Sequence, residues 1–438
     1  EAADAGAVMA FDRYGFLKPA GPKAWRRSRS ETLARICPFS PTAANEDELA
    51  QARFPAAPHQ DPHVGRFEAA YVGYAAEGEF RAAGSSGGLV TWTAAELLRC
   101  GLVDAVVHVS PVREEGPDAR LFRYRISRDA AAVAEGAKSR YYPIDLSHVL
   151  QEIRSVPGRY AVVGAPCFIK AVHLARANDA LLGERIVYTL GLFCGHMKSA
   201  RMVESFAWQM GRDGQAVTAI DYRHKDPNRP ANWYTARISL QDGAEDRRDW
   251  WSFVDGDWGA GFFQNSACNF CDDVAAETAD VAFGDAWLEP YSSDGRGTNV
   301  VVARSPVIDG LLKAAAADGR LNLGEVDGEF VRQTQAAGFR QRREGLALRL
   351  ATRRGGLMPR KRVAPRKPEI SRRRWAVYRM RGAVTAWSNR LFFVARRLGR
   401  RGIYLRWART ALTLYRAIAW SQGRLGRLVD RLERKGAI

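Results

Sequence analysis

The sequence is poor in several features that mark particular classes of protein. Six cysteines in 438 residues are too few for a scaffold held together by disulfides. No stretch approaches the roughly 18 uninterrupted apolar residues that a membrane-spanning helix needs. The Walker pattern and the spaced glycines of the Rossmann fingerprint are also missing. What remains is a chain with 46% hydrophobic residues, enough for the packed cores of about three domains of roughly 150 residues each.

Basic residues are concentrated near the end of the chain. The formal net charge is +18, yet residues 351–438 hold 25 Lys and Arg against three Asp and Glu, a net of +22 that leaves −4 for residues 1–350. The stretch 359–368 is a proline-punctuated basic linker. Two helical stretches are predicted after it, at 372–398 and 402–436.

Arginine, tryptophan and leucine are interspersed in these two helical stretches. In the second, Arg424, Arg427, Arg431 and Arg434 recur at helical spacing, with leucines on another face. This composition favours a helix that lies in an anionic membrane surface. Two other interpretations stay open: a helical hairpin packed on a partner or on the catalytic part, and a surface for single-stranded nucleic acid, for which we find no motif.

Four of the cysteines fall where thiols could meet. Cys167 lies between a strand-like run at 159–163 and a helical pattern, and Cys194 closes the next strand-like run. Cys268 and Cys271 form a single Cys-x-x-Cys knuckle. In an open α/β sheet the carboxyl ends of strands form the crevice where ligands bind, and a thiol at a helix amino terminus ionises more easily. These positions therefore suit metal ligation.

Spacing alone leaves three interpretations of these thiols. A zinc ribbon would normally supply two knuckles, whereas this chain has one knuckle and two isolated strand-end cysteines, so the pattern leans toward an iron–sulfur cluster. Structural zinc remains an alternative. So do inert thiols, because free cysteine is among the most buried residue types.

A second group of candidate residues precedes the cysteines. The small residues Gly84, Ser85, Ser86, Gly87 and Gly88 come just before a predicted helix, so their backbone N–H groups could approach a phosphate. A plain turn is the alternative, and the commoner one.

The stretch Lys138, Ser139, Arg140 and Tyr141 strengthens the phosphate-binding interpretation. It offers two cations, a hydroxyl group and an aromatic ring. Arg140 could hold a phosphate while Tyr141 covers a ring system, although a solvated loop explains the same residues equally well.

Five motifs in register resemble the coenzyme F-420 hydrogenase/dehydrogenase beta-subunit family. The resemblance runs from about residue 80 to residue 305, with a fainter trace at 11–16 and at Cys37-Pro38. Its motifs are the run 84–109, Val163-Gly164-Ala165-Pro166-Cys167, Gly191-Leu192-Phe193-Cys194-Gly195-His196, the 268–271 knuckle, and 279–285.

The resemblance implies an iron–sulfur flavoprotein in which FAD sits beside a 4Fe-4S cluster. The cluster cysteines then fall on Cys167, Cys194, Cys268 and Cys271. The 84–88 loop and the 138–141 stretch fall on the flavin side. A flavin accepts a hydride as two electrons and releases them singly, whereas a cluster carries one at a time. The implied partner is a redox protein or a hydride carrier: a deazaflavin, a nicotinamide or ferredoxin. No catalytic side chain is assigned.

Several polar residues near these motifs have both a purely structural and a functional interpretation. His196 is either a solvent-facing or satisfied loop histidine or a hydrogen-bond donor to the cluster. Asp285 ends a strand and is either a turn residue or a contact for substrate or flavin. Arg223 and Lys225 face an anionic coenzyme or a solvated strand edge. The acidic and aromatic loop 250–258 is predicted to wall the site.

The N-terminal part departs from the family pattern. Many relatives begin with a run of cysteines that binds further clusters, whereas here only Cys37-Pro38 remains, and the sequence opens with Glu1. A ferredoxin-like module is therefore either absent or outside this sequence. We expect an N-terminal segment at 1–79 that is a remnant of such a module, a catalytic domain at 80–350, and a basic linker with a helical tail at 351–438.

The predicted protein is an α/β oxidoreductase. It has a mixed sheet with helices around a flavin and iron–sulfur site, plus an α-helical basic C-terminal tail. It is expected to act in the cytoplasm, with peripheral binding to the inner face of the membrane through residues 372–436 as a further expectation. The alternative is a non-enzymatic, zinc-stapled adaptor that recruits partners or membrane through its basic tail.

Overall fold

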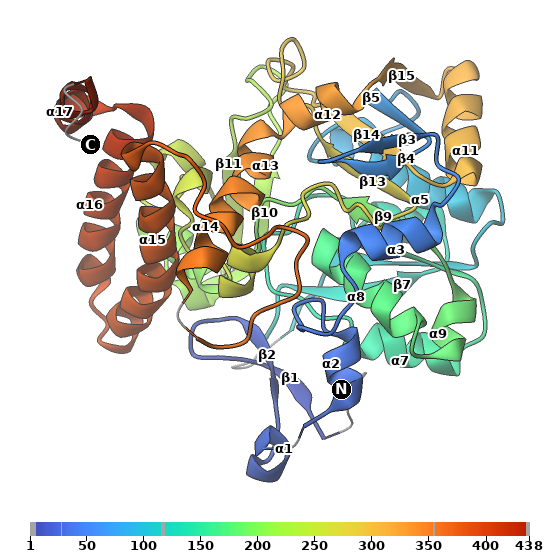
Figure 1. Cartoon of the computed structure of the whole chain (residues 1–438), viewed down its shortest axis with the longest axis horizontal. Helices are drawn as coiled ribbons and strands as arrows, with labels where there is room; N and C mark the ends of the chain where they lie inside the picture. Colours follow the sequence, from blue (N-terminus) through green and yellow to red (C-terminus); the bar gives the residue numbers. More distant parts are fainter. Residues whose placement is uncertain (1–5, 28, 115–118, 354, 435–438) are drawn as a thin grey trace.

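An eight-stranded mixed sheet forms the centre of the computed structural model, which describes residues 6–27, 29–114, 119–353 and 355–434 (Figure 1). Its strands, in sheet order, are β15 (Leu321–Val326), β5 (Ala69–Ala75), β14 (Asn299–Ala303), β13 (Val281–Asp285), β9 (Ile186–Leu192), β8 (Tyr160–Gly164), β6 (Ala105–Pro111) and β7 (Phe122–Ser127). Strands β5, β13, β9, β8 and β6 run in one direction, and the other three run in the opposite direction. The predicted mixed α/β fold is confirmed, and the strand-like runs that precede Cys167 and Cys194 are present as β8 and β9.

Helices cover both faces of this sheet, which explains why its inner strands are largely apolar. In β8, Ala161 and Val163 face one hydrophobic layer, while Tyr160 and Val162 face the other. The first layer is completed by α5 (Leu89–Arg99), α6 (Ala130–Ala134) and α11 (Pro306–Ala317). The second is completed by α7 (Ser147–Ser155), α8 (Pro166–Arg176) and α9 (Ala180–Arg185), and elsewhere by α12 (Gly328–Thr334) with the hairpin β3 (His59–Asp61) and β4 (Gly65–Phe67).

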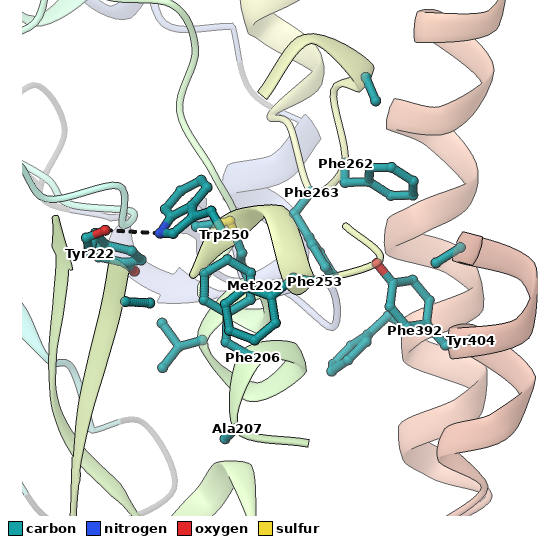
Figure 2. Packing of buried hydrophobic residues seen from close by; sticks show 14 of the residues in the cluster. Met202, Phe206, Ala207, Tyr222, Trp250, Phe253, Phe262, Phe263, Phe392 and Tyr404 are labelled. Carbon is teal, nitrogen blue, oxygen red and sulfur yellow. Dashed lines mark hydrogen bonds between the residues drawn. The ribbon is translucent and has the colours of Figure 1, made fainter. Parts of the chain in front are cut away.

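A second, smaller sheet carries the other large hydrophobic core. It is antiparallel and consists of β10 (Val217–His224), β11 (Thr235–Leu240) and β12 (Glu245–Asp249), with α10 (Arg201–Gln209) packed beside it. Figure 2 shows this core, in which the indole N–H of Trp250 donates to the carbonyl oxygen of Tyr222 at 2.9 Å. Phe262 and Phe263 extend the core toward the C-terminal helices.

The first two C-terminal helices are part of this second core. They are α15 (Arg372–Arg397) and α16 (Arg401–Trp420), which lie side by side. The Phe392 ring is fully buried, stacks on Trp208 at 4.5 Å and meets Tyr404 edge to face at 5.1 Å. The Tyr404 hydroxyl donates to the buried carboxylate of Asp255 at 2.9 Å. Of the interpretations left open for the tail, packing on the catalytic part therefore describes α15 and α16.

The helix predicted over 402–436 is two helices, so that prediction is wrong in its length. Ser421 adopts a left-handed conformation (φ +56°) after α16, and α17 (Gly423–Arg434) starts two residues later. None of the helices that the structure describes combines the length and the hydropathy that a bilayer crossing requires.

The basic stretch at 359–368 has no helix or strand, as expected of a linker, but two of its cations are buried. Lys361 contacts Asp272 at 3.0 Å, and Arg362 forms an ion pair with Glu277. Through these ion pairs, the 359–368 stretch is fixed to residues that closely follow the 268–271 knuckle. The remaining helices nearby are α13 (Ala336–Arg342) and α14 (Glu344–Thr352).

The N-terminal residues form short elements that precede strand β5. They form the hairpin β1 (Val8–Phe11) and β2 (Leu17–Ala20), then α1 (Lys23–Arg27), α2 (Glu31–Ile36) and α3 (Glu46–Arg53), and α4 (Phe80–Ala83) follows strand β5. Strand β5 lies inside the predicted segment 1–79, yet it is an inner strand of the large sheet. Cys37 caps the end of α2. The domain boundaries as such stay a prediction.

Removing the Phe392 ring tests the role of α15 in the second core. Because this ring is fully buried between Trp208, Phe263 and Tyr404, Phe392→Ala is expected to lower the free energy of unfolding by about 3–5 kcal/mol. Val394→Ala, two residues along the same helix and 40% exposed, should change it by less than about 0.5 kcal/mol. Denaturant unfolding followed by circular dichroism measures both, and equal effects would contradict a buried role for α15.

Candidate functional site

One cavity of about 660 Å³ lies at the edge of the large sheet where the parallel strands end. Its wall includes the residues that follow β8 and β9, the last residue of β13 and the loop after β5. This is the edge at which open α/β sheets bind ligands. Both groups of residues singled out from the sequence reach this cavity.

The four candidate cysteines all line the cavity. Cys167 lies in the first turn of α8, Cys194 follows β9, Cys268 lies in a short 3₁₀ segment, and Cys271 comes directly after it. Each of the six pairs of thiols is near enough for the two sulfur atoms to interact electrostatically. The chain thus brings three separate segments together at one wall.

Hydrogen bonds fix the backbone around these thiols. The Cys194 N–H donates to the carbonyl oxygen of Val274 at 3.0 Å, which joins the β9 end to the segment after the knuckle. The Met197 N–H donates to the Cys268 sulfur at 3.3 Å. The Cys271 thiol donates to the carbonyl oxygen of Asp273 at 3.5 Å.

A buried arginine, Arg342, is the closest cationic support of the cysteine wall. Its guanidinium donates to the carbonyl oxygens of Cys194 at 2.7 Å and Gly195 at 2.6 Å, and only 3% of the residue is exposed. Burial raises the pKa of all four thiols, to about 12 for Cys194, and the Arg342 charge acts in the opposite direction. Within the described residues, no three His, Cys, Asp or Glu side chains are grouped closely enough to hold a single metal ion.

The small-residue loop packs so closely against its neighbours that two of its positions require glycine. Gly88 has φ +81°, and a Cβ there would lie 2.2 Å from the carbonyl oxygen of Phe80. Gly87 packs between Gly73 and Asn299 and does not line the cavity, whereas Ser85, Ser86 and Gly88 do.

The loop leads directly into α5, whose first turn also lines the cavity. Gly88 provides no capping side chain at the N-terminus of α5, the Leu89 N–H donates to the side-chain oxygen of Asn299 at 3.1 Å, and Val90 and Thr91 are in the cavity wall. The Ser85 hydroxyl accepts a hydrogen bond from the Ser139 N–H at 2.9 Å, so the two predicted flavin-side segments touch. The positive dipole end of α5 makes this part of the wall suitable for an anionic group.

The 138–141 stretch is half-buried and lines the cavity. Lys138 has φ +104°, a strained conformation for a non-glycine residue, and its ammonium group lies 3.4 Å from Asp221. Arg140 donates to the carbonyl oxygen of Ala137 at 2.8 Å, and its buried Nε has no partner.

The Tyr141 ring forms part of an aromatic wall. Its centroid lies 4.7 Å from that of Trp258, which lines the cavity, and 5.8 Å from that of Trp250, which belongs to the second core. The loop 250–258 therefore contributes one of its tryptophans to the cavity, as predicted, and buries another beneath it. These rings limit the access of water to the space between the cysteines and the 138–141 stretch.

Asp285 and Arg223 form a pair at the cavity wall. The Arg223 guanidinium donates to both carboxylate oxygens of Asp285, at 2.9 and 3.0 Å, and lies 4.3 Å from the centroid of the Tyr234 ring. Arg223 is buried, so the solvated strand edge is wrong for it. Lys225 does not line the cavity: its ammonium group donates to the carbonyl oxygens of Ser86 and Arg296, and so ties the 84–88 loop to its neighbour.

His196 is buried and faces the cavity. Its ring stacks on Trp258 with centroids 4.2 Å apart, and its Nε2 atom has no hydrogen-bond partner. Burial lowers its pKa well below the usual range, and the charges of Lys198 and Arg381 act in the same direction. The solvent-facing interpretation of His196 is therefore wrong, and the ring is neutral.

Sequence reasoning missed two cations of the cavity wall, Arg342 and Arg381. Arg342 ends α13, and Arg381 comes from α15, so both are brought to the cavity by tertiary packing alone. No local signal distinguishes Arg381 from the other arginines of the tail. Among the described charged residues that line the cavity, five are basic and one is acidic: Lys138, Arg140, Arg223, Arg342 and Arg381 against Asp285.

Comparisons with known proteins agree with this geometry. Two parts of the chain match the family described as coenzyme F420 hydrogenase/dehydrogenase, beta subunit: residues 70–151 match its N-terminal part, and residues 158–329 match its C-terminal part. No curated protein matches the chain. A solved structure of the F420-reducing [NiFe] hydrogenase complex from Methanosarcina barkeri contains a chain with a similar fold, at a TM-score of 0.50 and 17% identity, covering 67% of this chain and 96% of that one.

The two family matches together span more than half of the sequence and include the loop, the 138–141 stretch and all four cysteines. The chain belongs to the coenzyme F420 hydrogenase/dehydrogenase beta-subunit family, which implies an oxidoreductase.

Proposed function

We propose that this oxidoreductase passes electrons between a 4Fe-4S cluster and FAD. Cys167, Cys194, Cys268 and Cys271 would hold the cluster, and the flavin would lie along the 84–88 loop and the 138–141 stretch. The observation that carries the proposal is that a single cavity is lined by all four thiols and by both flavin-side segments.

The cysteine wall suits a cluster better than a single zinc ion. Zinc would draw four sulfurs to about 2.3 Å from one centre. Here the thiols share a wall and interact in every pair, yet they are not gathered as around one ion in the part of the chain that is described. A cluster places iron and sulfide between its ligands and so spaces their sulfur atoms further apart.

The cationic wall suits an anionic coenzyme. Arg140 retains an unpartnered Nε, and Val90 and Thr91 of the first turn of α5 also line the cavity. Arg223 pairs with Asp285 and Lys138 lies 3.4 Å from Asp221, so an anion in the cavity would supply negative charge to the remaining three basic residues. The two phosphates of FAD supply that charge.

The residues of the wall have distinct roles in this proposal. Bound together, a flavin supplies two-electron hydride chemistry and a cluster supplies one-electron transfer. Arg342 places a positive charge beside the cysteines, which favours the gain of an electron there. Tyr141 and Trp258 exclude water, and neutral His196 presents a free ring nitrogen for hydrogen bonding.

The electron donor or acceptor outside this cavity is a redox protein or a hydride-carrying coenzyme, which could be a deazaflavin, a nicotinamide or ferredoxin. We also propose that the chain acts in the cytoplasm at the inner face of a membrane, to which part of the C-terminal region binds. The zinc-stapled adaptor is the competing function, and metal analysis separates the two.

Replacing each cavity cysteine tests the cluster. Anaerobically purified protein should be brown-yellow and contain about four irons per chain. Cys167→Ser, Cys194→Ser, Cys268→Ser and Cys271→Ser should each lose more than half of this iron, because each removes one ligand. Iron and acid-labile sulfide analysis with absorbance spectra measures the loss.

Cys100→Ser is the matched control for these variants. Cys100 is an exposed thiol that does not line the cavity, so its replacement should leave the iron content unchanged. Colourless wild-type protein that carries zinc would rule out the cluster in favour of the adaptor.

Removing the Arg140 guanidinium tests the flavin side. Loss of one charge-assisted hydrogen bond, about 1.5–3 kcal/mol, should raise the dissociation constant for FAD roughly 10- to 150-fold. Quenching of FAD fluorescence during titration of flavin-free protein measures the constant.

Arg125→Ala provides the control for Arg140→Ala. Arg125 is an exposed arginine on β7 that pairs with Glu135, outside the cavity, so this variant should bind FAD like the wild type. Unchanged affinity in Arg140→Ala would place the flavin phosphates elsewhere.

A further inference from the structure

The last helix, α17, turns its acidic residues inward. Arg373 of α15 forms ion pairs with both of them, to Asp430 at 2.8 Å and to Glu433 at 3.0 Å. Asp430 also accepts a hydrogen bond from the Ser421 hydroxyl at 2.7 Å. The negative charge of α17 is therefore neutralised on the side that faces α15.

The outward side of α17 is both apolar and basic. Leu425, Leu428 and Leu432 are separated by three and four residues, so they share one face, and their exposed fractions are 39%, 48% and 36%. Arg424, Arg427, Arg431 and Arg434 precede or follow these leucines and are exposed as well. We call these seven residues, together with Trp420, the α17 face.

Position in the molecule leaves the α17 face free. The helix lies at the edge of the molecule, beyond the α15–α16 pair and far from the large sheet (Figure 1). Trp420, at the end of α16, is 60% exposed. By contrast, α15 and α16 bury aromatic and aliphatic residues in the second core, and no described residue covers the leucines of α17 in that way.

We propose that the α17 face binds the anionic surface of a lipid bilayer, with the helix lying parallel to the membrane plane. Leucines flanked by arginines match the boundary between acyl chains and negatively charged headgroups, and an exposed tryptophan suits the same depth. This proposal rests on the membrane location proposed above. It specifies the helix and the class of lipid that are responsible for the binding.

Charge complementarity selects an anionic bilayer as the occupant. The two acidic residues of α17 form ion pairs with Arg373, and of the four outward arginines Arg434 also lies near the Asp430 carboxylate. Residues 1–350 have a net charge of −4, so the catalytic part would not be drawn to an anionic surface. The stretch 351–422 is also basic, and α17 differs from it in presenting three exposed leucines on one face beside its arginines.

Vesicle co-sedimentation of the full-length, cofactor-loaded protein tests the proposal. Vesicles of phosphatidylcholine with 30% phosphatidylglycerol, about one part in three anionic, should pellet the wild type at least tenfold more efficiently than pure phosphatidylcholine. The variant Leu425→Gln/Leu428→Gln/Leu432→Gln keeps every charge and should reduce binding about tenfold or more. High salt should weaken binding of the wild type, because the arginine contribution is screened.

A matched control replaces three leucine or valine residues of similar exposure elsewhere. Leu33→Gln, Leu181→Gln and Val307→Gln, exposed by 39%, 41% and 50%, should bind like the wild type when combined. Circular dichroism and thermal unfolding of both triple variants verify folding. A second variant, Arg424→Gln/Arg427→Gln, should also bind more weakly and serves if the leucine variant does not fold.

Three results would overturn the proposal: wild-type protein that stays in the supernatant with anionic vesicles, equal pelleting of the leucine variant, or equal pelleting on neutral and anionic lipid. Selective capture of an acidic protein without vesicle binding would overturn it too. Iron and flavin contents of the same preparations are read separately, so a colourless protein that still binds vesicles would count against the redox function alone.

Discussion

The parallel pairing of β8, β9 and β13 is the constraint on which the site depends. Because these neighbours run in the same direction, the residues that follow them emerge at one edge of the sheet: Cys167 after β8 and Cys194 after β9, with Asp285 closing β13. A hydrogen bond from the Cys194 N–H to the carbonyl oxygen of Val274 holds the segment after the knuckle at the same edge. A sheet with a reversed β9 would send Cys194 to the opposite edge, far from Cys167.

Much of this arrangement could be predicted because its determinants are local. The runs that became β8 and β9 are largely apolar, since helices cover both faces, and a Gly-Ala-Pro break marks the end of β8. What could not be predicted depends on residues far apart in the chain. Lys361 looks like part of a solvated linker until Asp272 and Glu46 surround it, and Arg381 resembles every other arginine of the tail until α15 is packed. Burial of such charges is determined by tertiary packing and cannot be inferred from the spacing of residues in the sequence.

The charges of the cavity wall bear on the kind of ligand that the cavity would bind. Arg223 is balanced by Asp285, and Lys138 lies close to Asp221, but Arg140, Arg342 and Arg381 have no carboxylate among their hydrogen-bond partners in the described structure. Burying cations without counter-charges is costly, so a wall with this composition is stable when anions complete it. Two anionic groups, a coenzyme with phosphates and a cluster held by thiolates, would do so at the two groups of residues where the unpaired cations lie.

The C-terminal region contributes residues to both the cavity wall and the second core. It begins beyond the residues that match the family, at 70–151 and 158–329, yet α15 places Arg381 in the cavity wall and Phe392 in the second core. Helix α17 is tied to the same α15 through Arg373 and its two acidic partners. Because α15 is a continuous helix of 26 residues, a surface that binds α17 would also fix the orientation of the cavity relative to that surface. Membrane binding through α17 would therefore control which side of the cavity a partner could approach, without any residue of the cavity touching lipid.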